Sequence, residues 1–452
     1  MKTGQGPTQA LAQHIAQIRY DAMPANVRTV AVQCVLDWTA VTLRAVDDPL
    51  VEMLVEQVIA EGGHPQAGLV GRAHRVSARQ AALVNGAASH ALDYDDVNIR
   101  MCGHPTVAVF PAVLALGQRM GSSGRDVLAA FVAGYETVCL LGGMVSPGHY
   151  ARGFHVTATV GAFGAAAGCA HLLRLDEERI RVALGIAATQ AAGLKSMFGT
   201  MCKPLHAGKA CESGMLAAEL AARGFTSRND VIECAQGFAA TQTDTFEPLF
   251  LGGPEMVRWN IPDNLFKYHA ACYQTHAMIE AIRALQAGSG FGPADVDRIV
   301  VRQDAGANTV CNIPRPDGGL ETKFSLRLLA AYAVHGLDTA DIDGYTDERT
   351  RDPALVSLRD RVEVVFTPNW PITRSEVTVK LKDGRELFAE HDSGVPDTDL
   401  RLQTDRLTSK LQSLVGTRLG PDRTRRITDA ALGFEALPNV AGFVEALAPT
   451  AR

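Results

Sequence analysis

Ionisable side chains interrupt apolar surroundings in five short stretches of the chain. The stretches cover residues 92–96, 103–106, 153–157, 203–209 and 267–276. Together they contain aspartates, histidines and lysines, the residue types that bind anionic groups and move protons near neutral pH. These stretches are therefore the candidates for a site.

The first stretch, Leu-Asp-Tyr-Asp-Asp, contains three acids, and Asp93 is its candidate site carboxylate. Clustered carboxylates repel one another unless a cation or hydrogen bonds relieve them. One alternative is a Mg²⁺ site on an aspartate-rich helix. The spacing disfavours it because Ile99 stands four positions after Asp95 and no second acidic metal motif follows. The other alternative is helix capping by solvated acids. We predict a site carboxylate and no bound metal.

Two histidines each precede an apolar stretch. His104 lies in Gly-His-Pro-Thr, where Pro and Thr favour a helix start, and His155 lies in Gly-Phe-His-Val-Thr, before a run of small residues. Both are candidates for acid–base work. The alternatives are a loop histidine and a buried histidine bonded to the backbone. The glycines after His155 do not match a dinucleotide-binding pattern.

The fourth stretch, Lys-Pro-Leu-His-Ala-Gly-Lys, places Lys203, His206 and Lys209 before a predicted helix over residues 212–223. Such a cationic group suits substrate carboxylates. The spacing of a phosphate-binding P-loop is absent. The alternative is a solvated basic loop.

The fifth stretch, residues 267–276, contains Lys267, His269, Cys272, Tyr273 and His276. It lies where the predicted elements change from helices alone to a mixture of helices and strands. A domain boundary is where a cleft is expected. The spacing fits no standard zinc site, and a hydrolase signature around Cys272 is absent. The alternative is the start of an ordinary amphipathic helix. The five stretches combined favour cofactor-free proton transfer on an anionic substrate, with fixed cations stabilising the charge that develops.

Two kinds of element must position these residues. Apolar spacings of three and four predict helices over residues 27–44, 50–59, 78–90, 107–120, 125–141, 176–192 and 212–223, with a buried central helix around 161–170. Strands are predicted over 296–301, 362–366, 375–381 and 385–391, the last two joined through Asp383-Gly384, with a helix over 323–335. We expect an all-helical domain over 1–265, completed by 396–452, and an α+β domain over 266–395.

The composition excludes several classes of protein. The chain has 452 residues, 47% hydrophobic and 20% charged, which is an ordinary globular balance. The net charge of −6 leaves no basic excess for nucleic acid. Nine cysteines without a CxxC pair argue against a disulfide framework. Neither a signal peptide nor a bilayer-spanning segment is expected, so we predict a soluble, cytoplasmic protein.

The ordered set LDYDD, GHP, GFH with GAFGAA, KPLHAG, a lysine nine residues before His276, and KFS resembles the MmgE/PrpD family. The resemblance covers about residues 10 to 415. It implies a large all-helical domain, a smaller α+β lid domain, a homodimer, no metal or organic cofactor, and a small di- or tricarboxylate substrate bound between the domains.

The resemblance also implies roles for individual residues. Lys203 and Lys267 hold substrate carboxylates, His104 and His155 transfer protons, and Asp93 positions or shares a proton. The further candidates for substrate binding are Lys209, His206, Cys272 and Tyr273.

Two departures from the family's pattern bear on the substrate. Val97 and Cys272 stand where the cis-aconitate decarboxylase branch has threonine and histidine, which argues against decarboxylation. The leading expectation is a hydro-lyase similar to 2-methylcitrate dehydratase. The alternatives are an epimerase of an aspartate- or succinate-derived polycarboxylate, similar to iminodisuccinate epimerase, and a non-catalytic carboxylate-binding relative.

Overall fold

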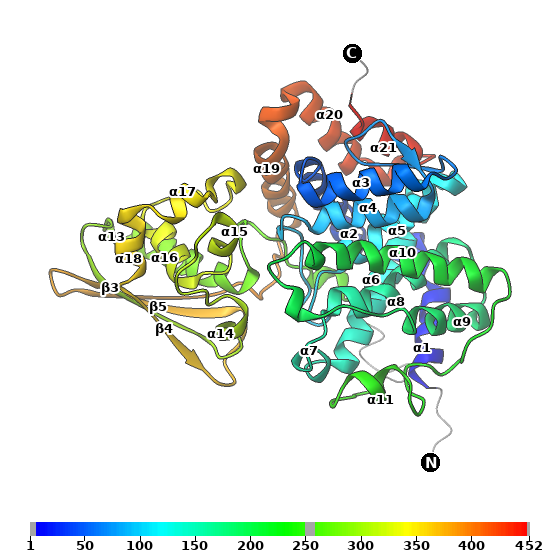
Figure 1. Cartoon of the computed structure of the whole chain (residues 1–452), viewed down its shortest axis with the longest axis horizontal. Coiled ribbons are helices and arrows are strands. Elements are labelled where there is room, and N and C mark those ends of the chain that lie inside the picture. The colour runs from blue at the N-terminus through cyan, green and yellow to red at the C-terminus, as the bar shows by residue number, and fades with distance from the viewer. Residues whose placement is uncertain (1–5, 249–257, 450–452) are drawn as a thin grey trace. The chain divides into compact units, whose positions relative to one another are not determined.

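The computed structural model describes residues 6–248 and 258–449, and the chain forms two compact units (Figure 1). The first unit combines Met1–Phe266 with Asp397–Arg452, and the second is Lys267–Pro396. The predicted fold class is confirmed, because the first unit is helical and the second adds a small mixed sheet.

The first unit is built from helices and one short hairpin. Its helices are α1 (Pro7–Gln17), α2 (Ala25–Arg44), α3 (Pro49–Glu61), α4 (Ala78–His90), α5 (Pro105–Met120), α6 (Gly124–Val145), α7 (Gly148–Ala151), α8 (Val156–Leu172), α9 (Glu177–Ala188), α10 (Cys202–Ala222), α11 (Phe238–Gln242), α19 (Leu400–Leu419), α20 (Pro421–Leu432) and α21 (Ala441–Leu447). Strands β1 (Ala67–Gly68) and β2 (Arg75–Val76) pair antiparallel.

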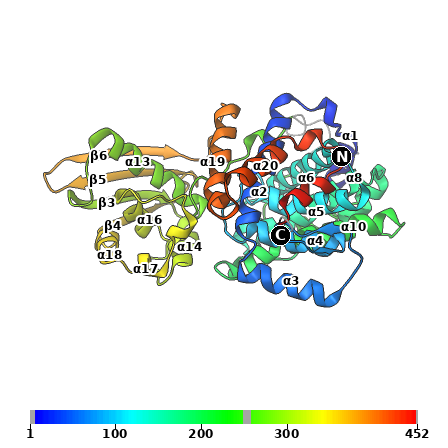
Figure 2. The same cartoon turned by 90° about the horizontal axis from the view of Figure 1, so that it is seen from above.

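Helix α8 is the centre of this unit. Nearly all of its residues are buried, and it packs against α5, α6 and α10 (Figure 2). Glycines allow the close approach: a Cβ on Gly164 would lie 2.2 Å from a methyl of Val138 on α6. The buried central helix predicted from small residues is confirmed.

Helix α6 is the one helix among the described residues that is long and apolar enough to cross a membrane by itself. Within the protein, 94% of its apolar window is buried. This helix is accounted for as part of the core of the first unit.

Helix α10 begins earlier than predicted. The expected start was residue 212, whereas the helix begins at Cys202. Pro204 and Gly208 suggested a loop, but a proline is tolerated in the first helical turn, where its missing N–H has no intrahelical partner. Lys203, His206 and Lys209 therefore lie on the helix itself, which corrects the predicted helix start and argues against the alternative of a solvated basic loop.

The second unit has a four-stranded sheet in the order β4–β3–β5–β6. Strand β3 (Val296–Asp304) is parallel to β4 (Val362–Thr367) and antiparallel to β5 (Arg374–Leu381), which pairs antiparallel with β6 (Glu386–Asp392). Helices α13 (His276–Ser289) and α16 (Leu326–Val334) pack on the sheet (Figure 1). The remaining helices are α14 (Ala307–Val310), α15 (Gly319–Thr322), α17 (Asp347–Thr350) and α18 (Pro353–Arg359).

The four predicted strands are confirmed, and β5 alternates buried and half-buried positions as a strand with one covered face does. The helix expected over 323–335 begins instead at Leu326. The side chain of Ser325 caps it by accepting from the Leu328 N–H at 3.3 Å, so Lys323 lies before the helix.

Candidate active site

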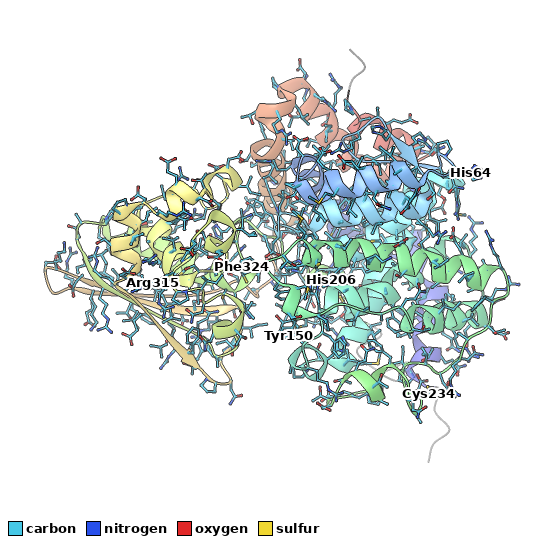
Figure 3. The ribbon with its side chains drawn as sticks, viewed as in Figure 1. His64, Tyr150, His206, Cys234, Arg315 and Phe324 are labelled. Carbon is cyan, nitrogen blue, oxygen red and sulfur yellow. The ribbon has the colours of Figure 1, made fainter. Side chains whose placement is uncertain are left out.

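Four helix ends in the first unit bring a polar cluster together. His90 is the last residue of α4, and the loop that follows it supplies Asp93 and Asp95. His104 and His155 are the N-cap residues of α5 and α8. Lys203 and His206 lie in the first turns of α10, whose start is marked by His206 in Figure 3. We call these seven residues the polar cluster.

Local backbone structure explains how these ends meet. Pro105 at the first position of α5 starts that helix directly after His104. The His104 N–H donates to Thr157 Oγ1 at 3.1 Å, which links the start of α5 to the start of α8. The His155 N–H donates to the Gly193 carbonyl at 3.0 Å. Asp93 adopts a left-handed conformation with φ 51°, which aspartate tolerates better than most residues.

Asp93 and Lys203 form a buried ion pair. Lys203 Nζ donates to Asp93 Oδ1 over 2.6 Å, and both side chains are about one-tenth exposed. The ammonium group also lies 5.3 Å from the centre of the Phe198 ring. Breaking a buried pair by removing one partner leaves a charge without compensation. The pair as a whole is neutral, and it holds the Lys203 ammonium group in place at the cluster.

Asp95 lies between two imidazoles. His90 Nδ1 is 3.0 Å from both of its oxygens, and His104 Nδ1 is 2.9 Å from Oδ2. The second contact lies off the hydrogen-bond direction, so it is best described as an ion pair. Burial alone would raise the pKa of Asp95, but the two imidazoles outweigh burial and hold that pKa well below its ordinary value. Asp95 is therefore a carboxylate at neutral pH.

The histidines of the cluster differ in what surrounds them. Burial lowers the pKa of His90 to about 4 although Asp95 opposes the shift. Burial, followed by the charges of His90 and Lys203, holds the pKa of His155 well below its ordinary value. His155 Nδ1 is 3.0 Å from His206 Nδ1, and burial also lowers the pKa of His206. His155 and His206 are therefore neutral bases at pH 7.

A metal ion does not suit the cluster. His90, Asp93, Asp95 and His104 each offer a donor atom within 4.8 Å of the others. The Lys203 ammonium group already bonds to Asp93, and both oxygens of Asp95 lie within 3.0 Å of ring nitrogens. A metal would have to displace these cationic and N–H partners, so the chemistry of the donor set favours protons.

A second layer of buried charge supports the loop between α4 and α5. Lys410 on α19 pairs with Asp37 on α2 at 2.6 Å and donates to the Tyr94 carbonyl at 2.7 Å. Asp96 accepts from Thr106 Oγ1 at 2.6 Å, and burial with the nearby Asp37 raises its pKa to about 8. Asp96 is therefore largely protonated at pH 7. It lies in the same loop as Tyr94, whose carbonyl accepts the hydrogen bond from Lys410.

Other predicted binding residues lie outside this cluster. Lys209 is exposed and pairs with Glu212 one turn along α10. Lys267, Cys272 and Tyr273 belong to the second unit. There Lys267 is buried, the Cys272 N–H donates to the Lys323 carbonyl at 3.0 Å, and the Tyr273 hydroxyl donates to the Ser393 carbonyl. Burial raises the pKa of the Tyr273 hydroxyl. Their predicted roles stay predictions.

Sequence reasoning missed two members of the cluster. His90 was seen only as the end of an apolar helix, and Asp95 only as part of an acidic run. The available signal was a histidine at the end of that helix, five residues before an aspartate. That spacing alone does not show that the loop turns back so that the carboxylate faces the ring.

Fold and cluster together define a helical protein with an internal group of acids and bases. Comparison with known families is specific: the MmgE/PrpD N-terminal domain matches residues 9–250 and the MmgE/PrpD C-terminal domain matches residues 269–435. The chain belongs to the MmgE/PrpD family, as its motifs predicted.

Curated proteins that resemble the chain include cis-aconitate decarboxylases. The chain is 28% identical to that of Homo sapiens over 379 residues, covering 80% of this chain and 78% of that protein. It is 29% identical to that of Mus musculus over 338 residues, covering 71% and 68%. It is 24% identical to that of Aspergillus terreus over 473 residues, covering 98% and 96%.

Proposed function

We propose that this chain is a cofactor-independent lyase that removes a proton next to a carboxylate of a small di- or tricarboxylate, and specifically a hydro-lyase. The observation that supports it is the buried Lys203 ammonium group among the histidines of the polar cluster. Its relatives with curated names are lyases of a tricarboxylate, which supports the substrate class.

The proposed chemistry uses a fixed cation and two proton carriers. Lys203 binds a substrate carboxylate and stabilises the negative charge that builds on it as the neighbouring C–H bond breaks. One histidine accepts that proton. The electron pair forms a carbon–carbon double bond, and the other histidine protonates the departing hydroxide, so that water leaves.

Dehydration is preferred over decarboxylation because of Val97. Its backbone pairs with Leu265, and its apolar side chain is buried. The family resemblance described above implies a hydroxyl-bearing threonine at this position in the decarboxylase branch. This difference supports a different reaction from that of the named relatives.

The second candidate function is epimerisation. It is favoured by the placement of His104 and His155, whose rings lie 4.6 and 5.9 Å from the ring of His90. Two acid–base groups in one cluster suit removal of a proton from one face of a carbon and its return to the other.

The test is proton NMR in D₂O with citrate, 2-methylcitrate, cis-aconitate, malate, tartrate and N-substituted aspartates. New vinyl signals from a hydroxy acid support a hydro-lyase. Deuterium beside a carboxylate without a vinyl product supports the epimerase, and loss of CO₂ from cis-aconitate means that the chain shares its relatives' reaction. If no compound of the panel reacts, the proposal is wrong.

We also propose that the protein is a homodimer, which sedimentation analysis tests.

Two variants link any turnover to the cluster. His155→Asn removes the imidazole, and we expect turnover to fall by at least 100-fold with the melting temperature retained. His64→Asn is the matched control, because His64 is an exposed histidine (Figure 3). It is expected to leave turnover unchanged.

A further inference from the structure

The two histidines assigned to proton transfer face different partners through the same ring atom. Nδ1 of His104 lies 2.9 Å from a carboxylate oxygen of Asp95. Nδ1 of His155 lies 3.0 Å from Nδ1 of the His206 imidazole. A carboxylate stabilises an imidazolium beside it by charge, whereas a neutral imidazole offers only a hydrogen bond.

We propose that these partners make the two histidines unequal: Asp95 keeps a proton on His104 and makes it the general acid, and His206 orients a neutral His155 as the general base. Asp95 and His206 are then positioning residues. The assignment rests on the proposed function for its chemistry, although the protonation states can be measured without substrate.

The tautomers follow from these partners. Asp95, as a carboxylate, only accepts, so the Nδ1–H of His90 donates to it. For His104, the nearby negative charge of Asp95 favours a hydrogen on Nδ1, without an aligned hydrogen bond. Nε2 of His104 is then the atom that gives up a proton, and it lies 3.9 Å from Asp93 Oδ1. His155 donates its Nδ1–H to His206, which leaves Nε2 bare to accept the substrate proton.

Protons and electrons balance over one turnover. The C–H bond breaks and its proton moves to His155 Nε2, while the electron pair forms the double bond. The carbon–oxygen bond breaks, and His104 Nε2 transfers its proton to the departing hydroxide to give water. His155 then returns its proton to solvent, and His104 takes one back.

The other charged groups near each ring agree with the assignment. His104 faces two carboxylates, Asp95 and Asp93, on the loop after α4. His155 faces His90 on α4, His104 before α5, and Lys203 and His206 on α10, and it has no carboxylate within ion-pair distance among the described residues. The Lys203 ammonium group opposes a positive charge on His155, whereas His104 has two carboxylates and the neutral ring of His90, 4.6 Å away, beside it.

The first experiment needs no substrate. The whole chain is labelled with ¹⁵N in histidine, its ring signals are followed from pH 5 to 9, and His104→Asn and His155→Asn variants assign the signals. We expect the ring of His104 to keep its second proton to higher pH than the ring of His155, which is expected to be neutral with hydrogen on Nδ1. A protonated His155 beside a neutral His104 overturns the assignment.

The second experiment separates the roles by the pH profile of kcat/KM. In Asp95→Asn, the alkaline limb is expected to move at least one unit toward lower pH, because His104 loses its counter-charge, and the acid limb is expected to stay in place. A purely structural role would lower kcat/KM equally at every pH and would contradict the proposal.

The control pair acts on the other histidine. His206→Phe removes the acceptor and is expected to lower kcat at least tenfold without moving the alkaline limb. His206→Gln restores an oxygen acceptor and is expected to recover part of that loss. Equal activity of the two variants overturns the role of His206. If no substrate of the panel turns over, the proposed function fails, while the NMR titration still decides the protonation states.

Discussion

Lys203 is the residue of the polar cluster whose chemistry is easiest to isolate, because its charge cannot be supplied by a neighbour. It is buried, it is bonded to Asp93, and it lies in the first turn of α10. In water an ion pair of this kind is weakened by solvent, but a buried ammonium group beside a carboxylate-bearing substrate interacts strongly.

Replacing Lys203 by alanine is expected to raise KM by one to two orders of magnitude, which corresponds to about 1.5–3 kcal/mol for a charged hydrogen bond. Steady-state kinetics on the folded variant measure it. Lys382→Ala is the control, since Lys382 is an exposed lysine that is not among the predicted site residues. Its KM is expected to stay within threefold. An unchanged KM in Lys203→Ala would remove the residue from substrate binding.

Asp96 predicts how stability depends on pH. Its pKa is raised to about 8 in the folded chain, chiefly by burial, against an ordinary value of 3.8. Between these values the folded state binds more protons than the unfolded state, so stability falls as pH rises from about 4 to about 8. Asp96→Asn resembles the protonated acid and removes this dependence.

The melting temperatures of the wild type and Asp96→Asn at pH 5, 7 and 9 measure the effect. We expect the variant to gain on the wild type as pH rises, by on the order of a few kcal/mol between the extremes. Parallel curves for the two proteins would show that Asp96 is ionised in the folded chain at all three values.

At the scale of elements, the cluster depends on how closely α10 approaches α4. A Cβ on Gly208 would lie 2.2 Å from the Leu83 carbonyl oxygen, a backbone atom that cannot move without its helix. Gly208 lies five residues after Lys203 on the same helix. Any side chain at this position therefore moves α10 away from the loop that holds Asp93.

Gly208→Ala is expected to cost about 1–3 kcal/mol through overpacking and to lower kcat/KM more than the loss of stability accounts for. Gly442→Ala on α21 is the control, because a Cβ there meets nothing within 4 Å. The alanine raises helix propensity and is expected to stabilise slightly. Chemical denaturation and kinetics on both variants check the pair; equal effects would contradict the role of the close approach.

Helices and strands were predictable where buried residues recur with the period of a helix or of a strand. α4 has the bounds expected from its apolar spacing, and β5 has the alternation of a half-covered strand. The start of α10 was not predictable in that way, because Lys203, Pro204 and Gly208 look like loop residues one by one. Only packing against α4 shows why a lysine, a proline and a glycine belong on this helix.

The polar cluster was predictable only where a residue is conspicuous by its own position or charge. His104 and His155 stand out because each precedes an apolar helix, and Lys203 stands out by its charge. The pairing of Asp95 with two imidazoles depends on the left-handed turn at Asp93, which no spacing in the sequence indicates. The contact between His155 and His206 likewise needs the tertiary approach of α8 to α10.

At the scale of the whole molecule, the chain leaves the first unit after Phe266 and returns to it at Asp397. The returning segment places α19 against α2, and its Lys410 reaches the Tyr94 carbonyl, between Asp93 and Asp95 in sequence. The C-terminal segment thus supports the backbone of the candidate site across more than 300 residues of sequence.

Because Lys410 contacts both Asp37 and the site loop, substitutions of this pair are expected to affect stability and activity differently. Lys410→Met removes the ammonium group that pairs with the buried Asp37 carboxylate and is expected to cost about 3–5 kcal/mol. Adding Asp37→Asn removes the uncompensated charge and recovers most of that loss. Activity is expected to stay low in the double variant, because the Tyr94 carbonyl still lacks the donor that holds the loop. Denaturation curves and kcat/KM for the single and double variants measure both quantities.

The control for this cycle is an exposed ion pair of the second unit. Lys380 and Glu386 are 2.6 Å apart on neighbouring strands with both side chains about half exposed, and Lys380→Met is expected to change stability by less than about 1 kcal/mol. Recovery of activity together with stability in the Asp37→Asn/Lys410→Met variant would show that Lys410 acts only by neutralising Asp37. Recovery of stability without recovery of activity supports the proposal that Lys410 also positions the site loop directly, through its hydrogen bond to the Tyr94 carbonyl.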